Sequence, residues 1–279
     1  MSLTFERRLG EAQRAILLAI ILLLVLFPTY WMVITSVKTN REMYKASSIL
    51  WVQSPTLSNF VELFTKTHFL AQLWNSIVVS VSSTVVAVAI SALGAYSLTR
   101  LRFPGRGAAG GAIFFAYLLP PALLFIPLYL LFNRIGLLDT LIALVLSYLT
   151  ITVPFCTWVL RGYFMSIPRE LDEAALVDGC TRLQSLRHVV IPLAAPGVAT
   201  AAIFAFTLAW NEYLYAFVFT SRAETTTATV GLTMLIMGDV FLWGQIMAGA
   251  VVMSLPILFL YIVAQRYVIT GMTAGAVKS

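Results

Sequence analysis

The chain has 279 residues, of which 60% are hydrophobic and only 11% are charged, whereas about 25% of residues are charged in soluble domains. This composition, with a mean hydropathy of +0.90, excludes an ordinary soluble domain and indicates an integral membrane protein. The net charge of +6 suits contact with the anionic lipid of a cytoplasmic membrane face. Nucleic-acid binding is not expected, because the basic residues form no stripe with interleaved aromatic residues.

Six apolar stretches have about the 20 residues that a helix needs to cross a bilayer. They run approximately over residues 15–37, 75–98, 108–131, 141–163, 194–219 and 245–263. The first stretch resembles a signal sequence, but it is too long and lacks a small-residue cleavage site, so we expect it to remain as a span. The sequence therefore predicts an all-α membrane protein with six transmembrane helices.

The distribution of positive charge predicts the orientation of these spans. If the amino terminus lies inside, 12 of the 18 lysines and arginines fall on the cytoplasmic side and 6 fall outside, so both termini are predicted to be cytoplasmic. Residues 1–14 then form a cytoplasmic segment, which either lies along the inner membrane surface or only anchors the topology. Cys156 falls in a span and Cys180 in a cytoplasmic loop, so we expect neither a disulfide nor a metal site.

Three prolines interrupt the third predicted span. Pro120, Pro121 and Pro127 each lack a backbone N–H in a segment that lies at membrane depth. We therefore expect the helix to bend here and its freed carbonyl groups to face a cavity or a neighbouring helix.

A polar segment, residues 166–192, separates the fourth and fifth predicted spans. Pro168 suits a first helical turn, three acidic residues follow near the positive end of the helix dipole, and Gly179 can end the helix in a left-handed conformation. Thr181 and Gln184 then fit a capping box that opens a second short helix. The apolar side of this second helix carries Leu183, Leu186, Val189 and Val190.

The residue order in this segment is similar to the signature loop of permease subunits of bacterial ATP-binding-cassette importers. Glu173-Ala174-Ala175 is followed by Gly179 and then by Val189, Ile191 and Pro192, where Val189 and Ile191 stand in place of the usual Ile and Leu. The resemblance covers most of the chain and narrows to the carbohydrate-uptake subfamily of the maltose-transporter type. The further segments that carry it are residues 100–106, 126–129, 136–140, 210–213, 265–267 and 271–278.

The resemblance implies a domain organisation and a set of partners. A six-span transmembrane domain would cover residues 15–266, with a cytoplasmic coupling-helix loop between spans four and five at about 166–192 and a cytoplasmic tail at 267–279. The partners implied are a second, homologous permease subunit in a heterodimer, two ATPase subunits, an extracytoplasmic solute-binding protein, a carbohydrate and membrane lipid. ATP and Mg would bind the ATPase subunits, and no cofactor is expected on this chain. The location implied is the bacterial cytoplasmic membrane.

In this family the first helix of the loop is a coupling helix that lies in a cleft of the ATPase. On helical spacing, Leu171, Ala174, Ala175 and Asp178 share one face and Glu173 falls beside it. Ala174 and Ala175 would fit the cleft while Glu173 or Asp172 pairs with a basic residue there. The alternative is an ordinary amphipathic helix that covers the permease's own inner face. The residues assigned to ATPase coupling are Arg169, Glu170, Leu171, Asp172, Glu173, Ala174, Ala175, Asp178 and Gly179.

Further candidate residues concern the solute and the tail. Trp210, Asn211, Glu212 and Tyr213 could offer an aromatic face and hydrogen bonds to a sugar, or they could anchor the fifth span or contact the partner permease. Tyr117 is a weaker candidate for the pathway, as is Asn75, which could instead cap the second span. By resemblance, Gly238 and Asp239 lie in a loop that faces the binding protein, with a structural lid as the alternative. The tail residues Thr273, Ala274, Gly275 and Lys278 would reach between the ATPase subunits, unless this end is frayed.

The sequence thus predicts a permease subunit of an ATP-driven, binding-protein-dependent carbohydrate importer. The chain has no GxxxxGK[ST] phosphate loop and no evident set of catalytic groups, so we do not expect it to be an enzyme. The alternative from another class is a secondary transporter, which would need ion-coupling carboxylates in mid-span. The solute stays open between a mono- or oligosaccharide, a polyol and a compound like glycerol phosphate.

Overall fold

The computed structural model describes the backbone of residues 2–43, 50–237 and 240–276, and the side chains of residues 13–43, 50–236 and 242–265. The chain divides into two compact units. The smaller unit combines Met1–Phe69 with Leu232–Ser254, and the larger unit combines Leu70–Gly231 with Leu255–Ser279. Most of the predicted functional residues belong to the larger unit.

The smaller unit contains α1 (Ser2–Ser36), α2 (Asn40–Met43), α3 (Ser58–Lys66), β1 (Ile236–Met237), β2 (Val240–Phe241) and the first part of α14 (Trp243–Ala276). The two short strands pair antiparallel, with Ile236 opposite Phe241. Asn59 is buried, and its Nδ2 donates to the carbonyl oxygens of Ser36 and Lys38, at 2.8 Å each. These bonds fasten α3 to the segment that follows α1.

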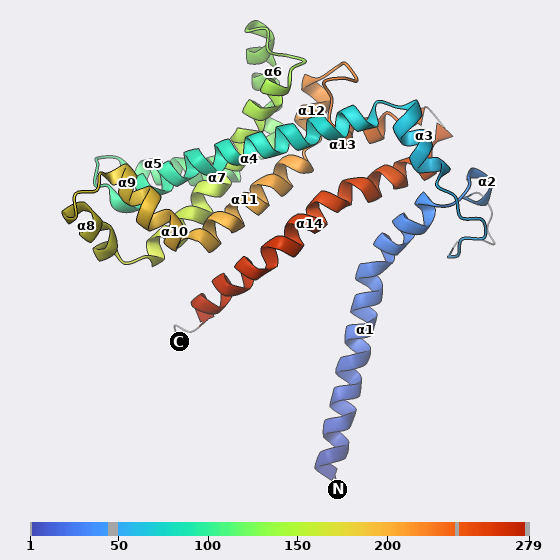
Figure 1. Cartoon of the computed structure of the whole chain (residues 1–279), viewed down its shortest axis with the longest axis horizontal. Helices are drawn as coiled ribbons and strands as arrows, with labels where there is room; N and C mark the ends of the chain where they lie inside the picture. Colours follow the sequence, from blue (N-terminus) through green and yellow to red (C-terminus); the bar gives the residue numbers. More distant parts are fainter. Residues whose placement is uncertain (1, 44–49, 238–239, 277–279) are drawn as a thin grey trace. The chain divides into compact units, whose positions relative to one another are not determined.

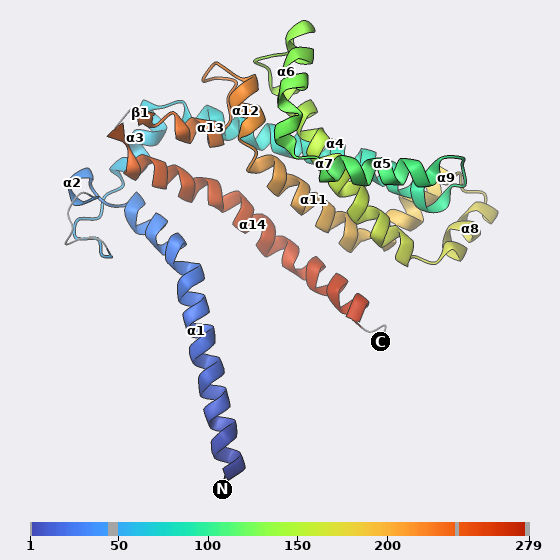
Figure 2. The same cartoon turned by 180° about the vertical axis from the view of Figure 1, so that it is seen from behind.

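The larger unit is a group of helices around α7 (Leu141–Ser166), which packs against α5 (Arg106–Leu118), α11 (Ala195–Trp210) and α12 (Leu214–Phe219). Figures 1 and 2 show α8 (Arg169–Val177) and α9 (Arg182–Ser185) together at one end of α7, near the end of α4 (Phe69–Arg100). The remaining elements are η2 (Pro121–Leu123), α6 (Phe125–Arg134), the π-helical turn η3 (Leu186–Val190), α10 (Ile191–Leu193) and α13 (Ala228–Thr233).

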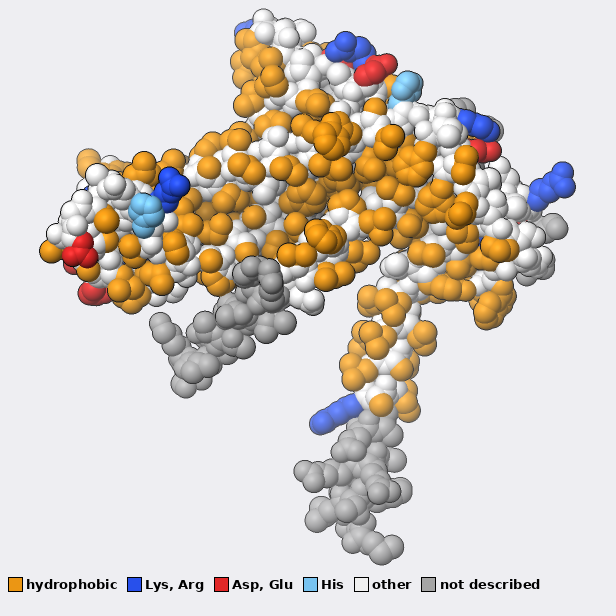
Figure 3. Space-filling model, in the orientation of Figure 1, with side chains coloured by type: hydrophobic (Ala, Val, Ile, Leu, Met, Phe, Trp, Pro, Cys, Tyr) orange, Lys and Arg blue, Asp and Glu red, His pale blue; other side chains and the backbone are white. Residues whose placement is uncertain are grey.

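The core of the larger unit depends on close approach between α7 and α11. Gly197 makes this possible, because a Cβ atom at this position would lie 2.3 Å from Cγ of Tyr163. Burial of apolar groups along this contact stabilises the helix pair. Figure 3 shows hydrophobic side chains along the helices of this unit and charged side chains at the end where α8 and α9 lie. An apolar outer surface of this kind is expected where helices face lipid.

Four helical segments in the described parts of the chain are long and apolar enough to cross a membrane. They are Gln13–Ser36, Phe69–Arg100, Leu141–Ser166 and Trp243–Gln265. A fifth is added if Arg182–Leu193 and Ala195–Trp210, which meet at a bend of 85°, form one span. The helical fold is therefore confirmed, while the predicted third and fifth spans are each broken into shorter helices.

The break in the third span lies at Pro120 and Pro121, as the prolines predict. The backbone becomes extended at Leu119 and Pro120 between α5 and η2. The carbonyl oxygen of Pro121 accepts a hydrogen bond from the Tyr215 hydroxyl of α12, at 3.0 Å, in addition to one from the Leu124 N–H, so a neighbouring helix bonds to the backbone at the break. Pro127 does not break α6, because it occupies the first turn, where a helix has no use for its N–H.

The break in the fifth span follows Trp210, where α11 ends, and α12 begins at Leu214. The sequence predicted one continuous stretch from 194 to 219, because the residues on both sides of Asn211 and Glu212 are mostly apolar. The structure differs since the side chain of Glu212 bonds to the backbone of the next helix and provides a local cap, described below.

Candidate functional site

The first candidate site is the helix pair that follows α7. Helix α8 begins at Arg169, one residue after Pro168, and carries Glu170 and Asp172 in its first turn. It ends at Val177, and Gly179, two residues further on, has a φ of 89° in the left-handed region, while the N–H of Cys180 donates to the carbonyl oxygen of Ala175 at 3.0 Å. The predicted glycine-terminated helix is therefore confirmed.

The second helix of the pair begins with the predicted capping box. The backbone N–H of Gln184 donates to the Thr181 hydroxyl, and the Gln184 side chain accepts from the Thr181 N–H at 2.7 Å. A π-helical turn follows at Leu186–Val190. Leu186 and Val190 are buried as predicted, but Leu183 is 64% exposed, because α9 lasts only four residues before the helix widens.

The inner face of α8 is fixed to the rest of the unit by Asp172. This residue is only 4% exposed, and its carboxylate accepts hydrogen bonds from the Tyr96 hydroxyl of α4, at 2.9 and 3.2 Å. The Ser185 hydroxyl of α9 donates to the same carboxylate. A buried carboxylate with two such donors is strongly held, because hydrogen bonds to a charged group contribute about 1.5–3 kcal/mol each. Asp172 thus joins α8 to both α4 and α9.

The outer face of α8 carries the residues that remain open to contact. Glu173 and Ala174 are exposed, Leu171 is 44% exposed and Val177 is 87% exposed, whereas Ala175 is buried. The sequence grouped Ala174 with Ala175 and offered Asp172 as a partner for the ATPase. The structure divides this set, because Asp172 and Ala175 face the larger unit and Ala174 faces away from it.

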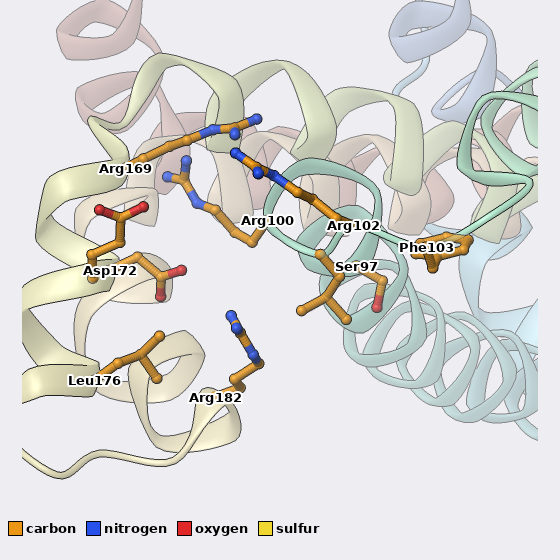
Figure 4. Close-up of a pocket in the computed structure, with 10 residues that line it drawn as sticks. Ser97, Arg100, Arg102, Phe103, Arg169, Asp172, Leu176 and Arg182 are labelled. Atoms are coloured by element: carbon orange, nitrogen blue, oxygen red, sulfur yellow. The ribbon is translucent and has the colours of Figure 1, made fainter.

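Arginines surround the base of α8. The Arg100 guanidinium donates to the carbonyl oxygens of Phe164 and Ile167 at the end of α7, at 3.2 and 2.9 Å. Arg169 donates to the carbonyl oxygen of Thr99 at 3.1 Å. These bonds use the unsatisfied carbonyls that every helix end presents. Figure 4 shows Arg100, Arg102, Arg169 and Arg182 around one pocket, together with Asp172. The cavity has a volume of about 830 Å³.

The second candidate site surrounds the break after α11. The Glu212 carboxylate accepts from the backbone N–H of Tyr215, at 2.9 and 3.1 Å, and from that of Ala216 at 3.2 Å. Negative charge and acceptor oxygens at a helix start satisfy its free N–H groups. Glu212 therefore caps α12, and a role of this residue toward a solute stays a prediction.

The neighbours of Glu212 divide between the core and the surface. Trp210 is 1% exposed, and its ring is stacked on Phe206 with centroids 5.4 Å apart. Asn211 is exposed and donates to the carbonyl oxygen of Thr207 at 2.9 Å. Tyr213 is partly exposed and stacked on Phe217. Of these four candidates, Asn211 and Tyr213 are the ones open to a ligand.

Tyr117 lines a cavity of about 280 Å³ at the break of the third span. Phe155 of α7 and Phe204 of α11 line the same cavity, and the ring centroids of Tyr117 and Phe155 lie 5.9 Å apart. Thr150 adds a hydroxyl to this aromatic lining. Aromatic rings with a few polar groups are the usual lining of small-molecule sites.

Asn75 lies within α4 and does not cap it, because the helix begins six residues earlier at Phe69. The side chain is buried, and its Nδ2 donates to the carbonyl oxygens of Glu224 and Thr226, at 2.7 and 3.0 Å. The loop before α13 is thereby tied to α4. The alternative of a helix cap is corrected, and Asn75 serves the packing of the larger unit.

The sequence analysis missed the network around Asp139, in the loop between α6 and α7. Its carboxylate accepts from the Arg222 Nε at 2.6 Å, from the Ser221 N–H at 3.0 Å and from the Thr225 hydroxyl at 2.5 Å. Burial alone would raise the pKa of Asp139, but these hydrogen bonds lower it below the ordinary value. The signal available in the sequence was the 136–140 segment, which indicated a turn but no partner.

The predicted residues of the loop that faces the binding protein and of the carboxyl-terminal tail are described only in part. Gly238, Asp239 and Lys278 fall outside the described residues. The backbone of Thr273, Ala274 and Gly275 continues α14, which ends at Ala276, so the predicted tail is helical where it is described. Within the described residues no cluster of three or more His, Cys, Asp or Glu could hold a metal ion, and Cys156 and Cys180 are both free thiols.

Comparison with known proteins places this arrangement in a family. Residues 85–274 match the family model described as binding-protein-dependent transport system inner membrane component. The chain is 38% identical to the inner membrane ABC transporter permease protein YcjP of Escherichia coli (strain K12) over 263 residues, which cover 94% of each chain. It is 38% identical to the sulfoquinovosyl glycerol transport system permease protein SmoH of Agrobacterium fabrum (strain C58 / ATCC 33970), over 96% of this chain and 94% of that protein.

A solved structure gives the same result for the fold. A chain of a bacterial ABC transporter involved in the import of the acidic polysaccharide alginate superposes with a TM-score of 0.81 at 26% identity, covering 93% of this chain and 96% of that chain. The family match, the relatives and this fold agree with one another and with the helical, apolar character of the chain. The chain therefore belongs to the binding-protein-dependent transport system inner membrane components, the membrane permeases of ABC importers.

Proposed function

We propose that this chain is a permease subunit of an ATP-driven, binding-protein-dependent carbohydrate importer, that it forms half of the translocation pathway, and that it docks an ATPase through α8. The support for the solute class comes from its relatives, which include a permease for sulfoquinovosyl glycerol and a transporter of alginate. Both solutes are carbohydrate compounds. The support for docking comes from α8 itself.

The observation that carries the proposal is the two-sided character of α8. Its inner face is held to α4 and α9 through Asp172, while Ala174 and Val177 on the outer face are exposed. Exposed apolar and small side chains beside charged ones are typical of a surface that receives a partner. A helix that only covered the permease would be expected to carry mainly polar side chains on this face, whereas Leu171 and Val177 are exposed.

The same contacts suggest how motion would pass into the membrane. An ATPase pair that closes on ATP and Mg would shift α8, and the bonds from Tyr96 and Ser185 would carry that shift to α4 and α9. Two such permease subunits, as a heterodimer, would then alternate between inward and outward openings, and a binding protein would deliver the solute. ATP hydrolysis belongs to the ATPase subunits in this scheme.

The proposed architecture has six spans between residues 15 and 266. The four long helical segments supply four spans, and the broken segments at 106–134 and 195–219 complete the set. Both termini and the 166–192 loop lie in the cytoplasm, in agreement with the positive charges. The cavity beside Tyr117 and the exposed Tyr213 would line the pathway, and the loop that contains Gly238 and Asp239 would face the binding protein.

Uptake in proteoliposomes tests this function. The full-length chain with the subunits that copurify with it is reconstituted, and labelled sugars, polyols and glycerol phosphates are offered with the cognate binding protein. We expect uptake only when ATP, Mg and the binding protein are all present. Uptake that needs no ATP and instead follows an imposed proton or sodium gradient would contradict the proposal and indicate a secondary transporter.

A further inference from the structure

The pocket at the base of α8 carries an excess of positive charge that the proposed docking of α8 to an ATPase does not explain. Four arginines line it, Arg100, Arg102, Arg169 and Arg182, against the two acidic residues Asp172 and Glu173, which leaves an excess of two positive charges. Among the described residues, no ion pair within 4.0 Å joins any of these arginines to an acid. Asp172 is already satisfied by Tyr96 and Ser185.

The arginines come from three segments and point into one space. Figure 4 shows the ends of Arg100, Arg102 and Arg169 near one another on one side of the pocket, and Arg182 on the other. Arg102 and Arg182 are exposed to solvent. Guanidinium groups repel one another unless an anion lies between them, and their planar donor pairs match the oxygens of a phosphate.

The depth of the pocket indicates what kind of phosphate it meets. The candidate span of α4 ends at Arg100, and that of α7 ends at Ser166, three residues before Arg169. Both helices therefore leave the apolar layer at the pocket, which is the level of lipid headgroups. Phe103, another lining residue, is partly exposed, as expected of an aromatic ring at a membrane interface.

The pocket and the proposed docking surface lie on different faces of α8. Arg169, Asp172 and Leu176 line the pocket from one side of the helix, and the exposed Glu173, which also lines it, lies where this side meets the outer face. The exposed residues Leu171, Ala174 and Val177 fall between them and point to the far side of the helix. An ATPase that covers the far side would leave the pocket facing the membrane.

We propose that this arginine pocket binds the phosphate of an anionic phospholipid headgroup, with Arg102, Arg169 and Arg182 as donors and Phe103 beside the glycerol region. Basic pockets between membrane helices on the cytoplasmic side are known to hold such headgroups. The bound lipid would neutralise the arginines and fix the base of α8 to the membrane surface. The proposal depends on the chain lying in a membrane, as its family does, and does not depend on which solute is carried.

The test measures lipid retention on the full-length chain with its copurifying subunits, by native mass spectrometry after exchange into phosphatidylcholine that contains dioleoyl phosphatidylglycerol. We expect selective retention of phosphatidylglycerol in the wild type. Arg102→Gln with Arg182→Gln should weaken retention about thirtyfold, since each basic residue near an anionic surface contributes about a factor of five. Arg102→Lys with Arg182→Lys should restore most of it.

A matched control removes the same charge elsewhere. Arg14→Gln with Arg187→Gln changes two exposed arginines outside the pocket and should leave retention within about twofold of wild type.

Equal retention by the glutamine pocket variant and the wild type would overturn the proposal, as would equal retention of phosphatidylcholine. Displacement of the lipid by millimolar inorganic phosphate would assign the pocket to a soluble anion, and loss of the ATPase without loss of lipid would assign it to an acidic side chain of that subunit. Solute uptake is measured separately, so failure here leaves the proposed function standing.

Discussion

Three carboxylates show how far the role of a single residue depends on its tertiary neighbours. Asp172, Glu212 and Asp139 each accept hydrogen bonds from within the chain, respectively from Tyr96, from the start of α12 and from Arg222. The sequence placed Asp172 in a functional segment through the family resemblance of its loop, and Glu212 because an ionisable group in a span needs water or a partner. The sequence could not identify the partners of Asp172 and Asp139, since Tyr96 lies 76 residues before Asp172 and Arg222 lies 83 residues after Asp139.

Glu212→Gln tests the capping role. Glutamine keeps one acceptor oxygen but loses the charge that favours the helix start, so we expect the free energy of unfolding to fall by about 1 kcal/mol. Thermal unfolding of the purified chain measures this change, with Asn211→Ser, an exposed neighbouring position, as the control. If Glu212→Gln unfolds at the wild-type temperature but alters the uptake rate, the residue serves the solute and not the helix.

Asp139→Asn tests the clamp between the α6–α7 loop and the segment after α12. Because the pKa of Asp139 is lowered in the folded state, its charged form adds stability that is full above the unfolded pKa of about 3.9 and is lost as pH falls through the folded pKa. We expect the variant to lose about 1 kcal/mol at pH 7, a value reduced for the partial exposure of the pair.

The pH series completes that test. The difference in unfolding temperature between wild type and Asp139→Asn should shrink as the pH is lowered below about 4, since the carboxyl is then protonated in the unfolded chain while it stays charged in the folded one. A difference that stays constant from pH 7 to pH 3 would show that the charge of Asp139 contributes nothing.

At the scale of elements, the helix pair after α7 was predictable because its signals are local. Pro168, Gly179, Thr181 and Gln184 each act on their own few residues, and three of the four do what the sequence predicts, with Pro168 one position outside the helix. Which face of α8 turns inward was not predictable, because the choice depends on Tyr96 of α4. The two breaks differ in how readily they could be predicted, since proline is a strong breaking signal, whereas Glu212 caps through a local contact but is not one of the usual N-capping residues.

Ala174→Asp and Glu173→Lys test the outer face of α8. Each change adds wrong charge or bulk to the proposed ATPase contact, and neither touches the bonds of Asp172. We expect copurification of the ATPase to fall about tenfold or more and uptake to fall with it, since charge at the centre of an interface commonly costs 2 kcal/mol or more. Membrane insertion should be unchanged.

The control for this pair is Arg187→Glu, which reverses an exposed charge on η3 of the same loop. It should copurify the ATPase at the wild-type level. Wild-type copurification by both α8 variants would mean that the outer face does not dock, and α8 would then only cover the permease.

At the scale of the whole molecule, composition was enough to predict an apolar helical chain in a membrane, and the loop spacing was enough to indicate the family. The count of unbroken spans was not predictable from hydropathy, which measures apolar length and is blind to the extended residues at Leu119 and Pro120. The division into two units was also not predictable from the composition, since both units contain long apolar helices.

The carboxyl-terminal segment gives a prediction at this scale. Deletion of residues 273–279 removes the last described turn of α14 together with the segment that resembles the family tail. We expect solute-stimulated ATP hydrolysis of the reconstituted complex to fall about fivefold or more, while insertion is unchanged, if this segment contacts the ATPase pair. Basal hydrolysis without solute is the internal control. Full stimulation after deletion would show that the tail has no role in coupling.

The central claim is that α8 passes motion from the ATPase to the membrane helices through the buried carboxylate of Asp172, and the number of solute molecules carried per ATP hydrolysed tests it most directly. Asp172→Asn leaves the exposed face of α8 intact but removes the charge that Tyr96 and Ser185 bind. We predict that the variant copurifies the ATPase and hydrolyses ATP near the wild-type rate, while solute carried per ATP falls about tenfold, the equivalent of about one charge-assisted hydrogen bond. An unchanged ratio of solute to ATP in this variant would contradict the claim.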